Sequence, residues 1–261
     1  MSKVERIAER LFHEGREKAQ FEWLRGEDAP DGLPEAYKIQ ELLIEKRLAA
    51  DMGPLAGWKI AVTSKPMQEL CGIDQPCVGA MLKPDIHPGP KDVSLGDFGR
   101  LGLEFELSIR IGTDDDGAGE MNADKAKAIS AAVAPAFELI EDRAANYTDF
   151  DAFSLVADNA WNGGVVLGKE IDGWRDIDWK TAPVTLNYND ETETANTGEA
   201  MGDPFEALAF IGRNLRERGL KFRAGDIVIT GSTIKTRYPS AGDRAKYAID
   251  GLGTVEMRVT A

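Results

Sequence analysis

Residues 100–112, with the sequence RLGLEFELSIRIG, constrain the fold more than any other stretch of the chain. Leucine, phenylalanine or isoleucine occupies every second position from Leu101 to Ile111, and small or polar residues occupy the positions between them. This two-residue period is typical of a strand that buries one face. We therefore predict a half-buried strand here, at the centre of a β-rich body.

Two acidic residues, Glu104 and Glu106, lie on the polar face of this predicted strand. Alternate side chains of a strand share a face, so their Cα atoms should lie about 7 Å apart. Two carboxylates at that separation repel each other, and they need water, a cation or a shared proton. The sequence leaves two interpretations open, a solvated outer face or half of a cation site.

A third carboxylate, Glu138, is stranded between Phe137 and Leu139 in the apolar segment 135–143. A lone buried carboxylate would cost several kcal/mol or become protonated unless it has a partner. One alternative is an ion pair with an arginine. The other is that Glu138 converges with Glu104 and Glu106 on a metal ion.

A single base, Lys59, interrupts the apolar strand predicted over residues 56–63. Its ammonium could extend to the surface along its aliphatic stem. Alternatively, it faces a pocket, where loss of water lowers its pKa.

Composition excludes several classes of function. The formal net charge of −14 argues against nucleic acid and anionic membranes as partners, and no apolar run reaches the length of a membrane span. With only two histidines, three-histidine zinc sites and HExxH sites are impossible. The chain lacks GxSxG, Walker and GxGxxG motifs, so we expect acid–base chemistry from Lys, Glu, Asp, Tyr or Cys. Its N-terminus lacks an apolar signal core, so we expect a cytoplasmic protein.

Patterning along the chain predicts two unequal parts. Helices over residues 3–24 and from Pro34 to about residue 52 form an N-terminal arm or lid, residues 1–55. Residues 56–261 form a catalytic body, which we predict to be an α+β fold built on a rolled, mixed sheet. Within it we expect an irregular loop over 84–99, a helix over 123–133 that Pro135 stops, a hairpin over 183–194 and a helix from Pro204 to Arg218.

Five segments together resemble the fumarylacetoacetate hydrolase superfamily, most closely its branch of 2-keto-4-pentenoate hydratases and 4-oxalocrotonate decarboxylases. They are GWKIAVTS at 57–64, LEFE at 103–106, PAFE at 135–138, ADN at 157–159 and ITGS at 229–232. The likeness extends over roughly residues 35 to 259. The E-x-E followed by a third acid is its most specific part.

The resemblance implies a β-roll that holds one Mg²⁺ or Mn²⁺ on Glu104, Glu106 and Glu138. The metal would chelate a small 2-keto or 2-hydroxydienoate acid, with Lys59 beside the substrate as an acid–base group or a carboxylate-binding cation. The further residues implied at the substrate are Asn159, Trp161, Thr230 and Ser232, with Asp158 as a second carboxylate. Such proteins are usually homo-oligomers.

The chain departs from the hydratase pattern in two places. Cys77 stands where the hydratases have an acid that handles the proton at the hydrated carbon, and Trp161 and Asn162 stand where small hydroxylated residues are common. We therefore expect a hydratase of 2-hydroxypenta-2,4-dienoate-like acids, with Cys77 as a candidate catalytic residue. The alternatives are a 4-oxalocrotonate-type decarboxylase, an acylpyruvate C–C hydrolase and a non-catalytic partner subunit with the same fold.

Overall fold

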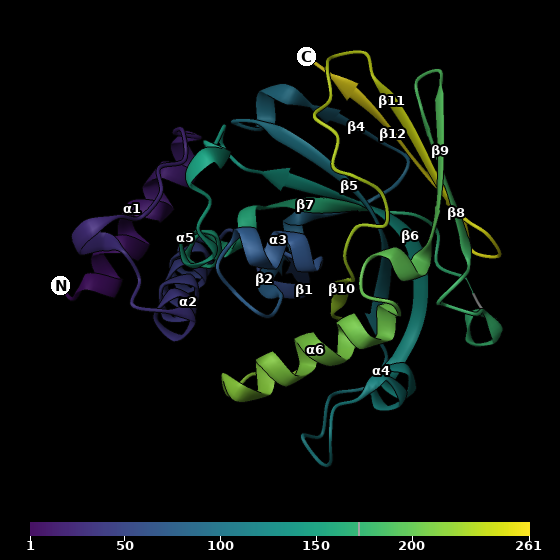
Figure 1. Ribbon diagram of the computed structural model, residues 1–261, viewed down its shortest axis with the longest axis horizontal. Helices are drawn as coiled ribbons and strands as arrows, with labels where there is room; N and C mark the ends of the chain where they lie inside the picture. Colours follow the sequence, from purple (N-terminus) through teal and green to yellow (C-terminus); the bar gives the residue numbers. More distant parts are fainter. Residues whose placement is uncertain (172) are drawn as a thin grey trace.

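A computed structural model describes residues 1–171 and 173–261 of the protein. Two curled sheets form its body. The larger sheet has seven strands in the order β2-β1-β10-β5-β6-β7-β3, and the smaller has five in the order β4-β12-β11-β8-β9 (Figure 1). The strands are β1 (Leu55–Ala61), β2 (Cys77–Leu82), β3 (Ile86–Pro88), β4 (Lys91–Ser94), β5 (Leu101–Ile111), β6 (Ser130–Glu141), β7 (Asn162–Leu167), β8 (Pro183–Tyr188), β9 (Glu191–Asn196), β10 (Ile227–Ile229), β11 (Arg244–Ile249) and β12 (Gly253–Thr260).

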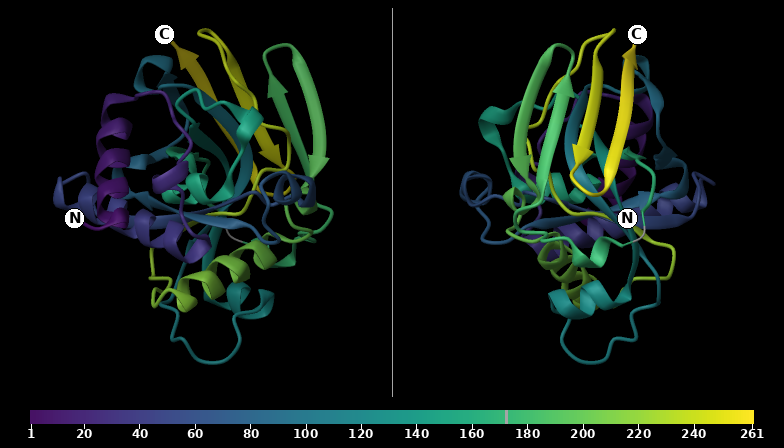
Figure 2. Two further views of the ribbon diagram at one scale, coloured as in Figure 1. Left: turned by 60° about the vertical axis from the view of Figure 1, so that its left-hand side comes forward. Right: turned by 90° about the vertical axis from the view of Figure 1, so that its right-hand side faces the viewer.

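The predicted strand β5 is central and pairs along its whole length with β6. Its apolar face packs toward the smaller sheet, where the Phe105 ring contacts Phe137 of β6 and Tyr247 of β11. Figure 2 shows the hairpins β8–β9 and β11–β12 standing beside the larger sheet. The expected mixed α+β roll is therefore confirmed. The opposite face of β5 carries the polar side chains, but most of it is buried as well, so the prediction that β5 is only half-buried is wrong.

Helices pack on the body in two groups, α1, α2 and α5 in one and α4 and α6 in the other. The helices are α1 (Lys3–Glu17), α2 (Leu33–Ala49), α3 (Lys65–Leu70), α4 (Ala123–Ile129), α5 (Ala152–Ala157) and α6 (Pro204–Glu217). The N-terminal helices α1 and α2 have their own apolar core, which includes Ile7 and Leu43 and extends to Leu155 of α5 and to Trp161. The division into an arm and a catalytic body stays a prediction.

Three expectations about local structure are wrong at their boundaries. The first helix ends at Glu17 rather than near residue 24, because Lys18 adopts a left-handed conformation and caps it, and Phe21 then bonds to Arg143. The helix at residue 123 ends at Ile129, since pairing with β5 extends β6 back to Ser130 and places Pro135 inside a strand. The segment 84–99 contains the short strands β3 and β4.

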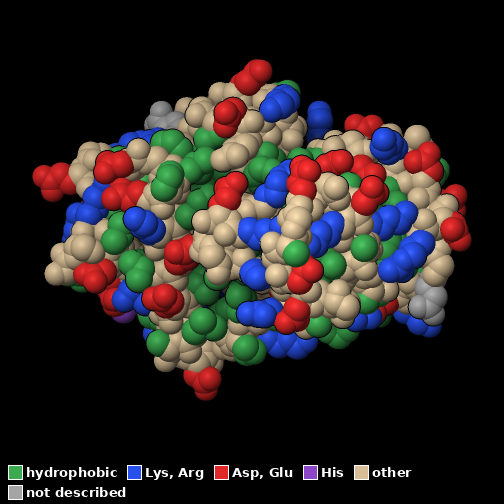
Figure 3. All heavy atoms as spheres, turned by 90° about the horizontal axis from the view of Figure 1, so that it is seen from below, with side chains coloured by type: hydrophobic (Ala, Val, Ile, Leu, Met, Phe, Trp, Pro, Cys, Tyr) green, Lys and Arg blue, Asp and Glu red, His purple; other side chains and the backbone are tan. Residues whose placement is uncertain are grey.

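The predicted hairpin over 183–194 is confirmed as β8–β9, with Asn189 in the left-handed conformation at its turn. None of the helices in the described residues combines the length and apolar character that crossing a bilayer demands. Acidic and basic side chains are interspersed over the face shown in Figure 3. That face therefore carries no field of a single sign.

Candidate active site

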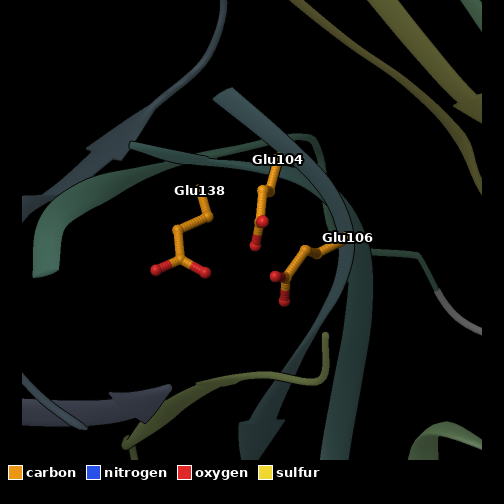
Figure 4. Close-up of side chains that lie close together, drawn as sticks. All are labelled: Glu104, Glu106 and Glu138. Carbon is orange, nitrogen blue, oxygen red and sulfur yellow. The ribbon is translucent and has the colours of Figure 1, made fainter. Parts of the chain in front are cut away.

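Three glutamates converge on the polar face of the larger sheet. Glu104 and Glu106 project from β5, and Glu138 lies directly opposite Glu104 on the neighbouring strand β6. Each offers a carboxylate oxygen within 4.8 Å of those of the other two (Figure 4). Glu106 and Glu138 are fully buried and Glu104 is half-buried, so the cluster opens toward the Glu104 side.

Burial and mutual repulsion make this cluster electrostatically unfavourable. Burial, followed by the charges of Glu138 and Glu104, raises the pKa of Glu106 well above its usual value. Burial also raises the pKa of Glu138 to about 7, although Lys59 opposes that rise. Glu106 Oε1 and Glu138 Oε2 have no hydrogen-bond partner among the described residues. Hard, unpartnered oxygens of this kind are the ligands that Mg²⁺ and Mn²⁺ prefer, so the residues fit a divalent ion.

Lys59 supplies the counter-charge to this cluster. Its side chain is 3% exposed, and its Nζ forms an ion pair with Glu138 and donates a hydrogen bond to the carbonyl of Ala160 at 2.9 Å. The alternative in which this lysine reaches the surface is therefore wrong, and so is the pairing of Glu138 with an arginine. Burial lowers the pKa of Lys59, but the neighbouring carboxylates outweigh burial and the pKa is raised overall, opposite to our expectation. The site thus contains a buried ammonium.

A strained turn holds Lys59 in place from the other side. Asn159, Ala160 and Trp161 all have positive φ angles, 56°, 50° and 53°, a conformation that costs roughly 1–2 kcal/mol per residue. The Asn159 side chain fixes the turn to β2 by accepting from Ala80 N at 2.7 Å and donating to Ala80 O at 2.8 Å. Asn159 therefore holds the turn whose Ala160 carbonyl accepts the hydrogen bond from Lys59.

Close packing against Gly79 completes this arrangement. A Cβ atom at Gly79 would lie 2.8 Å from the Asn159 carbonyl oxygen and 2.9 Å from Lys59 Cγ. Only glycine lets the strand, the turn and the lysine approach so closely. No periodicity in the sequence indicates the turn, because its conformation depends on β2.

The loop that follows β10 orients the carboxylates. The Gly231 N–H donates to Glu106 Oε2 at 2.7 Å, and the Thr236 hydroxyl donates to Glu104 Oε1 at 2.6 Å. Neither contact was predicted. The hydroxyl of Thr230 donates to the backbone of β5, and that of Ser232 bridges Phe105 N and Ile234 O. Both hydroxyls thus tie the loop to β5 beside the cluster.

Comparison with known proteins identifies the family and the fold of this chain. Residues 73–260 match the family described as fumarylacetoacetate (FAA) hydrolase C-terminal. The chain belongs to the fumarylacetoacetate hydrolase family. It is 33% identical over 222 residues to 2-keto-4-pentenoate hydratase 1 of Dechloromonas aromatica, covering 84% of this chain and 83% of the relative. It is 30% identical over 231 residues to 2-hydroxyhexa-2,4-dienoate hydratase of Comamonas testosteroni, covering 87% and 86%.

Two solved structures share this fold over most of the chain. The 4-oxalocrotonate decarboxylase of Pseudomonas putida G7, complexed with magnesium and adipate, has a TM-score of 0.88 at 25% identity, covering 98% of this chain and 97% of that chain. Fumarylpyruvate hydrolase of Pseudomonas aeruginosa, in complex with Mn²⁺ and pyruvate, has a TM-score of 0.61 at 16% identity, covering 78% of this chain and 89% of that chain, and shows the fold alone.

Cys77, the departure from the hydratase pattern, lies close to Lys59. It pairs with Ala61, two residues beyond Lys59 on the same face of the β1–β2 pair. Its side chain is completely buried, and burial raises the pKa of its thiol to about 12. Cys77 is therefore a neutral thiol at physiological pH.

The structure places two predicted residues, Asp158 and Trp161, away from the carboxylate cluster. Asp158 Oδ2 lies 3.1 Å from Arg143 Nη2, and burial raises the pKa of this aspartate to about 6 although Arg143 and Arg47 oppose the rise. The Trp161 ring packs edge-on against Phe21 of the arm. Both residues line a cavity that the three glutamates do not line, while the carbonyl of Ala160, which lies between them in sequence, accepts from Lys59.

Proposed function

We propose that this protein is a metal-dependent hydratase that adds water to 2-hydroxypenta-2,4-dienoate-like acids and forms 4-hydroxy-2-keto acids. The observation that carries the proposal is the buried carboxylate cluster in contact with an ammonium, Lys59. Relatives of similar length with about 30% identity that bear hydratase names support it. Glu104, Glu106 and Glu138 would hold one Mg²⁺ or Mn²⁺. When bound, the ion would supply Lewis acidity toward the carboxylate and 2-oxo oxygens of the substrate.

In this proposal Lys59 handles charge and protons beside the substrate. One proton leaves the 2-hydroxyl oxygen of the dienol and one arrives at C5, which gives an enone. The oxygen of a water molecule then bonds to C4, and a proton reaches C3, so one water is consumed. The buried ammonium can bind the substrate carboxylate or move the proton at the 2-oxygen, and Glu138 and Ala160 O hold it in position.

A second candidate function is decarboxylation of a 4-oxalocrotonate-like diacid. Two observations favour it, the overall likeness to 4-oxalocrotonate decarboxylase and the neutral thiol of Cys77. In this reaction the bond to the distal carboxylate breaks, its electron pair enters the dienolate, CO₂ leaves and one proton is taken up. A thiol with a pKa near 12 is a poorer relay to water than a carboxylate, which disfavours hydration.

We also propose that the protein is a cytoplasmic homo-oligomer. Exposed apolar side chains, Leu48, Met52 and Leu55, run from the end of α2 to the start of β1 and offer a surface for a second copy. Both cysteines are buried and unpaired, which suits a reducing compartment. Light scattering of the purified protein would test the oligomer.

Activity measurements with both acids would distinguish the two reactions. Each acid is followed by loss of its ultraviolet absorbance with Mn²⁺ present, and the product is identified by mass. We expect 4-hydroxy-2-keto acid from the dienoate. Release of CO₂ with no hydrated product would overturn the hydratase proposal in favour of the decarboxylase.

Thermal denaturation tests the metal site without relying on activity. At 100 times its dissociation constant, a bound ion adds about 2.7 kcal/mol of stability, or roughly 5–11 °C in Tm. We expect Mn²⁺ to give such a shift in the native protein but not in Glu106→Gln. The matched control is Glu256→Gln, which removes a carboxylate paired with Lys246 on the smaller sheet and should keep the shift. A native protein without any Mn²⁺-dependent shift contradicts the assignment.

A further inference from the structure

A cavity of about 310 Å³ lies where the N-terminal helices meet the strands of the body. We call it the seam pocket and define it by Arg47 of α2, Lys91 of β4, Arg143, Asp158 and Trp161. It differs from the candidate active site because the Glu104, Glu106 and Glu138 side chains do not line it. Its volume is at the lower end of the range for small-molecule sites.

The basic side chains of the seam pocket have unused hydrogen-bonding capacity. Within residues 1–171 and 173–261, no hydrogen bond or ion pair engages the guanidinium of Arg47 or the ammonium of Lys91. Arg47 lies close to Arg143, since each places a guanidinium nitrogen within 4 Å of a Cβ built on Gly15. Two arginines and a lysine therefore face one cavity.

The acidic side chains around the pocket are mostly engaged already. Glu141 accepts hydrogen bonds from the N–H groups of Gly99 and Arg100. Asp85 accepts from Leu82 N and from the Asn162 side chain. Asp158 is paired with Arg143, and Asp97 is exposed at the rim. These carboxylates form no hydrogen bond with Arg47 or Lys91 among the described residues. Burial lowers the pKa of Arg47, and the charges of Asp158 and Asp85 partly offset that lowering.

Arg143 is the decisive residue because it is buried and only partly satisfied. Its side chain is 2% exposed, and its guanidinium stacks over the Phe21 ring at 5.4 Å. Nη1 donates to Asp158, but Nε has no hydrogen-bond partner among the described residues. A buried donor left without a partner destabilises the protein unless a ligand satisfies it. Its backbone is also held at a φ of 46°, and such strain concentrates at ligand sites.

We propose that the seam pocket binds a small oxyanion, a carboxylate or a phosphate, with Arg47, Arg143 and Lys91 as donors. The planar guanidinium fork matches two oxygens of either group, and an anion would accept hydrogen bonds from donors that the described residues leave unused. The pocket shares the 158–161 segment with the candidate active site, since Asp158 and Trp161 line it while Ala160 O holds Lys59. Binding itself does not depend on the proposed hydratase activity.

The site can be tested by measuring the Tm of the metal-free protein with two probes, succinate and inorganic phosphate. Sodium chloride at equal ionic strength is the reference. We expect a saturable rise in Tm with at least one probe, and a loss of affinity of at least tenfold in Arg47→Met. The matched control is Arg223→Met, which removes an exposed guanidinium paired with Asp114. Succinate alone would assign the site to carboxylates, and phosphate alone would assign it to phosphates.

Three further variants test the assignment of binding to this pocket rather than to the carboxylate cluster. Lys91→Met should weaken binding as Arg47→Met does, and it serves if the latter fails to fold. Glu106→Gln should bind the anion normally, because it changes only the candidate metal site. Because Trp161 lines the pocket, anion binding should change the tryptophan fluorescence of the native protein. Trp161→Phe should still bind the anion but should lack this change. The absence of saturable binding, or equal affinity in Arg47→Met, Lys91→Met and the native protein, overturns the proposal.

Discussion

Replacing Lys59 with methionine tests the electrostatic account of the candidate active site. The substitution keeps the apolar stem and removes the ammonium that balances Glu138, whose side chain has no exposed surface. Breaking a buried ion pair by removing one partner costs about 3–5 kcal/mol. In a chain of 261 residues each kcal/mol shifts Tm by roughly 2–4 °C, so we expect a fall of about 6–20 °C in the metal-free protein.

Scanning calorimetry with and without Mn²⁺ provides the measurement. The loss should shrink when the ion is present, because a dication then balances the same carboxylates. The double variant Lys59→Met/Glu138→Gln should recover most of the stability, since neither partner is left as an isolated charge. Turnover should fall by about 10²–10⁴ in kcat/KM if Lys59 acts on a proton. A metal-free Lys59→Met protein with an unchanged Tm would refute the buried pair.

Three further variants examine residues around Lys59 and the neighbouring buried residue Asp158. Gly79→Ala should destabilise the protein by about 1–3 kcal/mol and lower kcat/KM, because the new methyl group would overlap the Asn159 carbonyl and the Lys59 stem; denaturant unfolding and kinetics measure both. Cys77→Asp should increase hydration relative to decarboxylation, and an unchanged product ratio would remove residue 77 from the water-handling step. The pKa of Asp158, about 6, lies above its ordinary 3.8, so stability should fall as pH rises from about 4 to 6; urea titrations across this range should show a weaker decline in Asp158→Asn.

The predicted elements differ in how well local patterning determined them. The strand β5 was predictable because its two-residue period extends over eleven residues and one face is buried throughout. The boundary at Ser130 was not, because residues 130–133 are helix-compatible in sequence and become a strand only through pairing with β5. The same applies to Phe21, whose backbone bonds to Arg143 after the first helix has ended.

By itself the sequence determined that Glu104 and Glu106 share a face and that Glu138 needs a partner, because alternation and the cost of burial are local properties. Tertiary structure alone decided which partner this would be. The register of β5 against β6 brings Glu138 to the other two carboxylates, and β1 brings Lys59 to it. The ammonium keeps a raised pKa because three carboxylates from other strands outweigh its loss of water, a balance that depends on distances in space.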